Sequence, residues 1–122
     1  MPTADPTLPR ALVALPGWRW AEGMRSDTGW RVSWEDAAGH GVVQGHLPDL
    51  AYPAPGRCVH AMLCATVRYT DAFKNSDPTG VWFEVYYGEE VTPQGYESGP
   101  TLGEACASAL VAIGRVGPRG GD

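Results

Sequence analysis

Histidine and cysteine residues spaced four apart are the first candidates for chemistry, because such pairs can bind zinc or form a nucleophile with its base. His60 and Cys64 have this spacing in a segment that we predict to be helical, so their side chains share one helix face. With His46 or Cys58 they would supply the nitrogen and sulfur ligands that zinc favours. Cys58 lies only two residues from His60, however, and points elsewhere on a regular helix. We therefore interpret the pair as a buried cysteine and a histidine at the helix boundary, and we expect no metal or other cofactor.

The same residue types allow a cysteine nucleophile with a histidine base, which we treat as a weaker alternative. Only Cys58 has a local feature that would activate its thiol, because it lies near the start of the predicted helix, where the pKa of a thiol is lowered. Acidic pairs occur at Glu35-Asp36 and Glu89-Glu90, but adjacent strand residues point to opposite faces and make poor acid–base partners. The common phosphate-loop, dinucleotide-binding, zinc-protease and nucleophile-elbow motifs are missing. We therefore predict a protein that is not an enzyme and has no catalytic residue.

Aromatic residues are more informative about function. Segment Val81–Tyr87 alternates with a period of two, so its odd-numbered residues are expected to face the helices and its even-numbered residues the opposite side. Arginines of the preceding strands are expected beside the even-numbered residues. A sheet face that combines Trp, Tyr and Arg has the composition of protein-interface hot spots. The predicted binding residues are Trp82, Glu84, Tyr86, Arg19 and Arg31.

Two alternatives exist for this face. Aromatic rings and arginines can stack a base and pair with a phosphate, which would make the face a nucleotide site. The N-terminal helix or a dimer partner can also cover the face, in which case its aromatic residues belong to the core.

Short strands are predicted in the first half of the chain, where apolar and polar residues alternate. The three strands are Trp18–Trp20, Trp30–Glu35 and Val42–Gly45, which together form an antiparallel meander. Before them, Leu8–Leu15 is expected to form one or two helical turns. After them, Leu47–Pro55 is expected to be irregular, because its three prolines each lack a backbone donor.

The second half begins with a helix predicted over Gly56–Thr70. Asn75–Gly80 is then expected to turn the chain into the strand Val81–Tyr87, the most strand-like segment of the sequence. A loop is predicted at Gly88–Pro93 and a short antiparallel strand at Gln94–Ser98. The stripe with which the helix packs on the sheet is Val59, Met62, Leu63, Thr66 and Val67.

The last helix has recognisable signals at both ends. Thr101-Leu102-Gly103-Glu104 has the Thr-x-x-Glu form of a capping box, and Gly114 is a suitable C-terminal stop. Its predicted buried stripe consists of Leu102, Ala105, Cys106, Ala109, Leu110 and Ile113.

These elements predict an α+β fold with a mainly antiparallel sheet, made of the three-stranded meander plus a hairpin, and two main helices packed on one face. A chain of 122 residues fits one domain of ordinary size. We expect a flexible arm over residues 1–9, a single α+β domain over residues 10–114 and a disordered Gly/Pro-rich tail over residues 115–122.

Composition excludes several classes of function. The formal net charge is −5 and the nine basic residues are dispersed, so we expect no direct binding to nucleic acid. No apolar run approaches the roughly 20 residues of a membrane span, so we expect no membrane partner. Three cysteines without a C-x-x-C motif argue against a disulfide framework, so we expect a cytoplasmic protein. We also expect it to be a monomer or a homodimer.

Four features are spaced along most of the chain: the fragments 14–20 and 23–25, Leu47-Pro48-Asp49-Leu50 ahead of a helix, a Trp-containing strand and a Thr-x-x-Glu-Ala helix. Together they resemble small accessory proteins encoded by bacteriophages and prophages. The resemblance transfers no catalytic residue. It implies an accessory protein that binds and disables a host factor, such as a CRISPR effector or another defence protein.

We therefore expect a non-enzymatic binding protein whose partner is a host protein. The alternative is a small-molecule or nucleotide-binding protein that sequesters its ligand as an oligomer, with a pocket between subunits.

Overall fold

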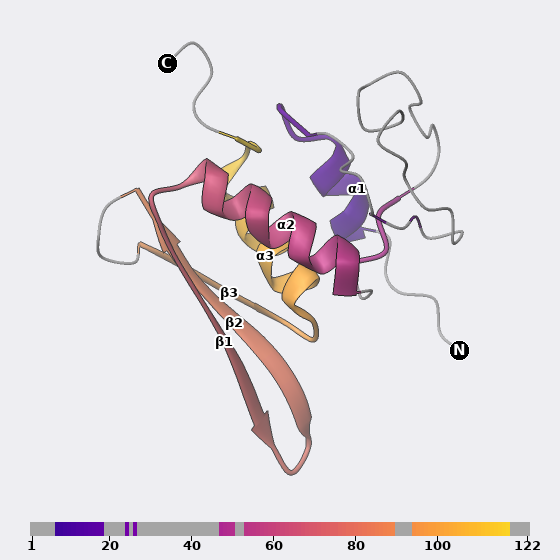
Figure 1. Cartoon of the computed structure of the whole chain (residues 1–122), viewed down its shortest axis with the longest axis vertical. Coiled ribbons are helices and arrows are strands. Elements are labelled where there is room, and N and C mark those ends of the chain that lie inside the picture. The colour runs from indigo at the N-terminus through magenta and orange to yellow at the C-terminus, as the bar shows by residue number, and fades with distance from the viewer. Residues whose placement is uncertain are drawn as a thin grey trace.

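Three helices and one antiparallel sheet form the described part of the chain (Figure 1). The computed structural model describes residues 7–18, 24, 26, 47–50, 53–89 and 94–117. These elements confirm the predicted α+β class, with helices packed against the sheet. In chain order they are α1 (Thr7–Val13), α2 (Pro53–Thr66), β1 (Tyr69–Asp77), β2 (Gly80–Gly88), β3 (Gly95–Gly99) and α3 (Leu102–Ile113).

Helix α2 begins earlier and ends earlier than predicted. Its first turn includes Pro53 and Pro55, which a helix tolerates there because the first backbone N–H groups have no partner within the helix. The prediction of irregular structure through Pro55 was therefore wrong. The burial of the predicted stripe is confirmed, since four of its residues are buried and Met62 is half-buried against the core. Its predicted packing on the sheet was wrong, because α2 packs mainly against α3. After Thr66 the chain leaves the helix and enters β1 at Tyr69.

Strand β1 replaces the last residues of the predicted helix and the first half of the predicted turn. It pairs with β2 from Tyr69 opposite Gly88 to Asp77 opposite Gly80, so only Pro78 and Thr79 form the turn. The Asp77 carboxylate accepts hydrogen bonds from the backbone N–H groups of Thr79 (2.7 Å) and Gly80 (3.2 Å), and also from the Thr79 hydroxyl. These donors, the Thr79 hydroxyl foremost, hold the pKa of Asp77 below its usual 3.8.

Helix α3 has the ends that its sequence predicts. The Thr101 side chain caps the helix by accepting from the backbone N–H of Glu104 at 3.2 Å, and Gly114 ends it in the left-handed region at φ 91°. Strand β3 lies within one residue of the predicted Gln94–Ser98 and pairs with β2, so the sheet has the order β1-β2-β3.

Helix α3 lies at the centre of the described fold. It packs against β2 and β3 on one side and against α1 and α2 on the other, whereas α2 reaches the sheet only along part of β1. Figure 1 shows α2 crossing α3 and the far end of the β1–β2 hairpin extending away from all three helices. The turn residues and much of β1 are accordingly exposed.

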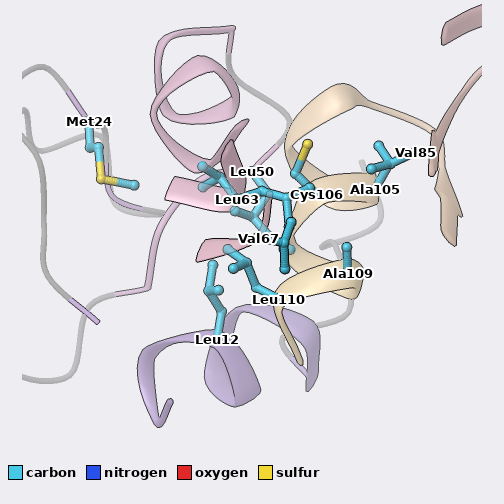
Figure 2. Packing of buried hydrophobic residues seen from close by; sticks show 12 residues of the cluster. Leu12, Met24, Leu50, Leu63, Val67, Val85, Ala105, Cys106, Ala109 and Leu110 are labelled. Carbon is cyan, nitrogen blue, oxygen red and sulfur yellow. The ribbon is translucent and has the colours of Figure 1, made fainter. Parts of the chain in front are cut away.

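The core forms where these elements meet. In Figure 2, Leu12 of α1 points toward Leu110 of α3, while Val85 of β2 lies beside Ala105. Met24 is also fully buried, and Ser26 forms an isolated antiparallel bridge with Pro48. Among the described residues, those that are fully buried include Leu12, Met24, Ser26, Pro48, Val59, Leu63, Val85, Ala105, Cys106, Ala107, Ala109 and Leu110.

The prediction of a disordered tail was wrong for its first three residues, 115–117, because hydrogen bonds anchor them to three other parts of the chain. The Arg115 guanidinium forms a 2.8 Å ion pair with Glu89 and donates to the backbone oxygen of Thr66 at 3.0 Å. The backbone N–H of Val116 donates to the Pro16 oxygen at 2.8 Å, and that of Gly117 to the Thr66 hydroxyl at 2.8 Å. Specific hydrogen bonds thus offset the low helix and strand propensity of this segment.

Two other predictions fall largely outside the described residues. Of the predicted meander, only Trp18 is described, and it lies outside any helix or strand and packs against the core. The first six residues of the predicted arm are likewise not described, and its last three form the start of α1.

Candidate functional site

Strand β2 places its side chains on two different faces, as its alternation predicts. Val85 is fully buried under the helices, and Phe83 and Tyr87 pack against the same core. Val81 shares this side of the strand but is 49% exposed, and it is the second residue after the hairpin turn. Trp82, Glu84 and Tyr86 therefore occupy the outward face of the sheet.

The register of the sheet determines which residues join them. Residues directly opposite one another in paired strands lie on the same face. Trp82 lies opposite Asn75, Glu84 opposite Phe73 and Ser98, and Tyr86 opposite Asp71 and Tyr96. We call the outward cluster the aromatic face and define it by the residues Phe73, Trp82, Glu84, Tyr86 and Tyr96.

Three rings of the aromatic face pack against one another across the strands. The Tyr86 ring lies 5.8 Å from the Phe73 ring at an interplanar angle of 74°, and 5.0 Å from the Tyr96 ring at 50°. Edge-on and tilted contacts at these distances are favourable for aromatic pairs. Phe73 and Tyr96 are nevertheless each 47% exposed, so the cluster is ordered by its own packing while it remains open to solvent.

Glu84 is held within this cluster by two hydrogen bonds. One carboxylate oxygen accepts from the Tyr96 hydroxyl at 2.7 Å, and the other accepts from the Asn75 side-chain amide. The bond to Glu84 raises the pKa of Tyr96, because it stabilises the protonated phenol. A second pair of this kind lies on the same face, where the Tyr69 hydroxyl donates to Asp71 at 3.0 Å and its pKa is raised for the same reason.

The charge of the outward face is uniformly acidic in the described strands. Asp71, Asp77 and Glu84 occupy it, whereas Lys74 lies opposite Phe83 and therefore on the helix side. No Lys or Arg of the described strands falls on the outward face. The predicted binding residues Arg19 and Arg31 lie outside the described residues, so the structure brings together Trp82, Glu84 and Tyr86 only.

Two of the candidate cysteine and histidine residues, Cys64 and His60, lie near each other on α2. The Cys64 sulfur lies 3.8 Å from His60 Nε2 and 3.3 Å from the Thr70 hydroxyl. The interpretation as a buried cysteine and a boundary histidine was wrong, because Cys64 is exposed and His60 lies in the middle of α2. Within the described part of the chain, no three His, Cys, Asp or Glu side chains form a group that could hold a metal ion. His46 lies outside the described residues.

The expectation of a lowered pKa at Cys58 was wrong. Helix α2 starts at Pro53, so Cys58 is more than a turn from the helix N-terminus, whose dipole acts mainly within the first turn. Partial burial raises the pKa of the Cys58 thiol, and the charge of Arg57 offsets only part of this effect.

The acidic pairs provide no acid–base site among the described residues. Glu89 is bound to Arg115 in an ion pair, so its carboxylate has a structural partner. Glu35, Asp36 and Glu90 lie outside the described residues.

Two members of the aromatic face were not predicted as site residues. Tyr96 lies in a strand that was predicted, and pairing that strand with Val81–Tyr87 would have placed it beside Tyr86. Phe73 carried no such signal, because β1 itself was not predicted and only the pairing of β1 with β2 brings Phe73 opposite Glu84.

No family model, curated protein or solved structure matches this chain in comparisons with known proteins. Among the described helices, none combines the length and the apolar character needed to cross a membrane.

Proposed function

We propose that this chain is a non-enzymatic protein-binding module and that a partner protein docks on the aromatic face. The observation that carries the proposal is a group of rings ordered by mutual contacts, in which Phe73 and Tyr96 each remain 47% exposed. Aromatic rings that are already ordered lose little conformational freedom when a partner covers them. Tyr and Trp are also the residues most enriched among interface hot spots.

The position of the face supports the same proposal. The helices pack on the other side of the sheet, and the far end of the β1–β2 hairpin extends away from them (Figure 1). A partner can therefore approach this face without displacing any described helix. The resemblance to phage accessory proteins makes a host factor, such as a CRISPR effector or another defence protein, the partner that we propose.

The charge of the face counts against the nucleotide-binding alternative. A nucleotide phosphate would meet the carboxylates of Asp71 and Glu84 and, within the described strands, no cation on that face. Like charges at short range are unfavourable, so aromatic stacking alone would have to hold the ligand.

Site-specific photo-crosslinking tests the proposal directly. The photoreactive residue p-benzoylphenylalanine replaces Phe73 or Tyr96, and in a matched control it replaces Ala112, which is exposed on α3. The variants are produced in the kind of cell in which the natural protein occurs, and these cells are irradiated. We expect one discrete adduct from positions 73 and 96, and none from position 112. Adding Tyr86→Ala should abolish the adduct while circular dichroism shows an unchanged fold.

Several outcomes would contradict the proposal. Equal adducts from position 112 would mean that the partner does not select the aromatic face. The lack of any adduct from positions 73 and 96 would mean that this face binds no protein. An adduct with twice the mass of the chain would show that the face pairs with a second copy, as the homodimer alternative requires. Unfolding of the Tyr86→Ala variant would show that the rings are core residues.

A further inference from the structure

The carboxylates of the outward face indicate the chemistry of the partner, an inference that rests on the proposed function. Three acidic residues, Asp71, Asp77 and Glu84, share this face with no Lys or Arg of the described strands, which gives it a formal charge of −3. Asp71 and Asp77 are six residues apart on β1, so the acidic positions extend over about 20 Å. A partner that carries several cations would complement this face better than a neutral one.

Glu84 is the carboxylate best placed to bind a cation. It lies between Trp82 and Tyr86 along β2 and opposite Phe73 on β1, so aromatic residues flank it on three sides. Its two oxygens accept one described hydrogen bond each, from Tyr96 and from Asn75. An ionised carboxylate has about four acceptor positions, so capacity remains for two further donors.

The rings around Glu84 reinforce the attraction for a cation. The face of an aromatic ring is electrostatically negative and attracts a cation placed within about 6 Å of its centre. Phe73 and Tyr96 are nearly half exposed, so a cation that reaches Glu84 can also contact their rings. The same groups oppose an anion, since carboxylates and ring faces both repel it.

Arginine fits this arrangement better than lysine. Its guanidinium is planar, so it can stack on a ring while it donates two parallel hydrogen bonds to one carboxylate, and it is more weakly hydrated than an ammonium group. We propose that the aromatic face binds an arginine-bearing segment of the partner protein, with one guanidinium paired to Glu84 and stacked against the rings beside it. Further arginines of the segment pair with Asp71 and Asp77.

Peptide titration followed by NMR tests this proposal without knowledge of the partner. The ¹⁵N-labelled protein is titrated with three capped heptapeptides in which glycine alternates with arginine, lysine or glutamine. We expect the arginine peptide to cause saturable shifts centred on Phe73, Glu84 and Tyr96. The lysine peptide should bind several-fold more weakly and the glutamine peptide should cause no saturable shift, and added salt should weaken the binding of the arginine peptide.

Two matched variants test the role of Glu84. Glu84→Gln keeps an acceptor for Tyr96 but removes the charge, and we expect about tenfold weaker binding of the arginine peptide. Glu97→Gln makes the same charge change on the helix side of β3 and should leave the affinity unchanged. Thermal unfolding of both variants establishes that each is folded.

The possible failures separate the two proposals. Equal affinities of Glu84→Gln and the unmodified protein, or equal binding of the glutamine peptide, would overturn arginine recognition. If crosslinking from positions 73 and 96 then still captures a partner, the face binds protein by apolar contact and only this inference fails. If the arginine peptide shifts residues elsewhere and no crosslink forms, both proposals fail.

Discussion

Three thiols in this chain have different surroundings, and burial determines the chemistry of each. Cys106 lies in α3 and is fully buried. Desolvation, together with the nearby Cys64, raises its pKa to about 12. Cys64 is exposed on α2, at hydrogen-bonding distance from Thr70. Cys58 is half-buried, and its pKa is raised. Local sequence does not reveal these differences, because burial depends on how α2 and α3 pack together.

We expect these thiols to be alkylated in a fixed order. At about pH 8, a thiol with a pKa near 12 is a thiolate in only about one molecule in ten thousand, and the thiolate is the reactive form. In the native protein, iodoacetamide should therefore modify Cys64 first and leave Cys106 unmodified, as measured by mass spectrometry of timed digests. In concentrated guanidinium chloride all three should react at similar rates. Native modification of Cys106 as fast as that of Cys64 would contradict the described core.

At the scale of elements, the local signals in the sequence were sufficient for both ends of α3 and for the buried stripe of α2, but not for the ends of α2. The capping box at Thr101, the stop at Gly114 and the apolar stripe of α2 each act over a few residues, so they can be recognised without knowledge of the fold. The faces of β2 were also predictable, because alternation with a period of two assigns them. That alternation is enough to place Trp82, Glu84 and Tyr86 on one face of the strand.

Strand β1 could not be predicted from the same kind of signal. It is an edge strand, and its second half lies beyond the helices, so neither of its faces there needs apolar residues. The polar run Lys74-Asn75-Ser76-Asp77 therefore resembles a turn although it pairs with β2 over its whole length. The position of Phe73 in the site depends on this non-local pairing, which is why sequence reasoning missed it.

The contact between β3 and α3 gives a test at this scale. A Cβ added at Gly99 would lie 2.8 Å from the backbone nitrogen of Ala105, so backbone rather than a side chain would have to move. We expect Gly99→Ala to lower the free energy of unfolding by about 1–3 kcal/mol, measured by urea denaturation.

The matched control for this variant is its neighbour. Ser98 is exposed on the outward face, and Ser98→Ala should change the free energy of unfolding by less than about 0.5 kcal/mol. Equal stability of Gly99→Ala and Ser98→Ala would show that β3 does not approach the start of α3 as closely as described.

At the scale of the whole molecule, the segment 115–117 connects elements that are distant in sequence. Arg115 reaches the end of α2 and the end of β2, and Val116 reaches the turn after α1. Gly17 allows this approach, because it has φ 86° and a Cβ at this position would overlap the backbone oxygen of Val116. Composition predicted disorder here, since the partners of this segment lie up to about 100 residues away and no local pattern reveals them.

Truncation tests whether this segment stabilises the fold as a unit. A chain that ends after Gly114 loses the hydrogen bonds of Arg115, Val116 and Gly117, each of which contributes about 1 kcal/mol before the entropy of ordering three residues is subtracted. We expect a net loss of about 1 kcal/mol and a melting temperature lower by a few degrees, measured by calorimetry. A chain that ends after Gly117 keeps every one of these bonds and should have the same melting temperature as the full-length protein. Because the two truncated chains differ by three residues only, equal melting temperatures would show that residues 115–117 contribute no net stability to the fold.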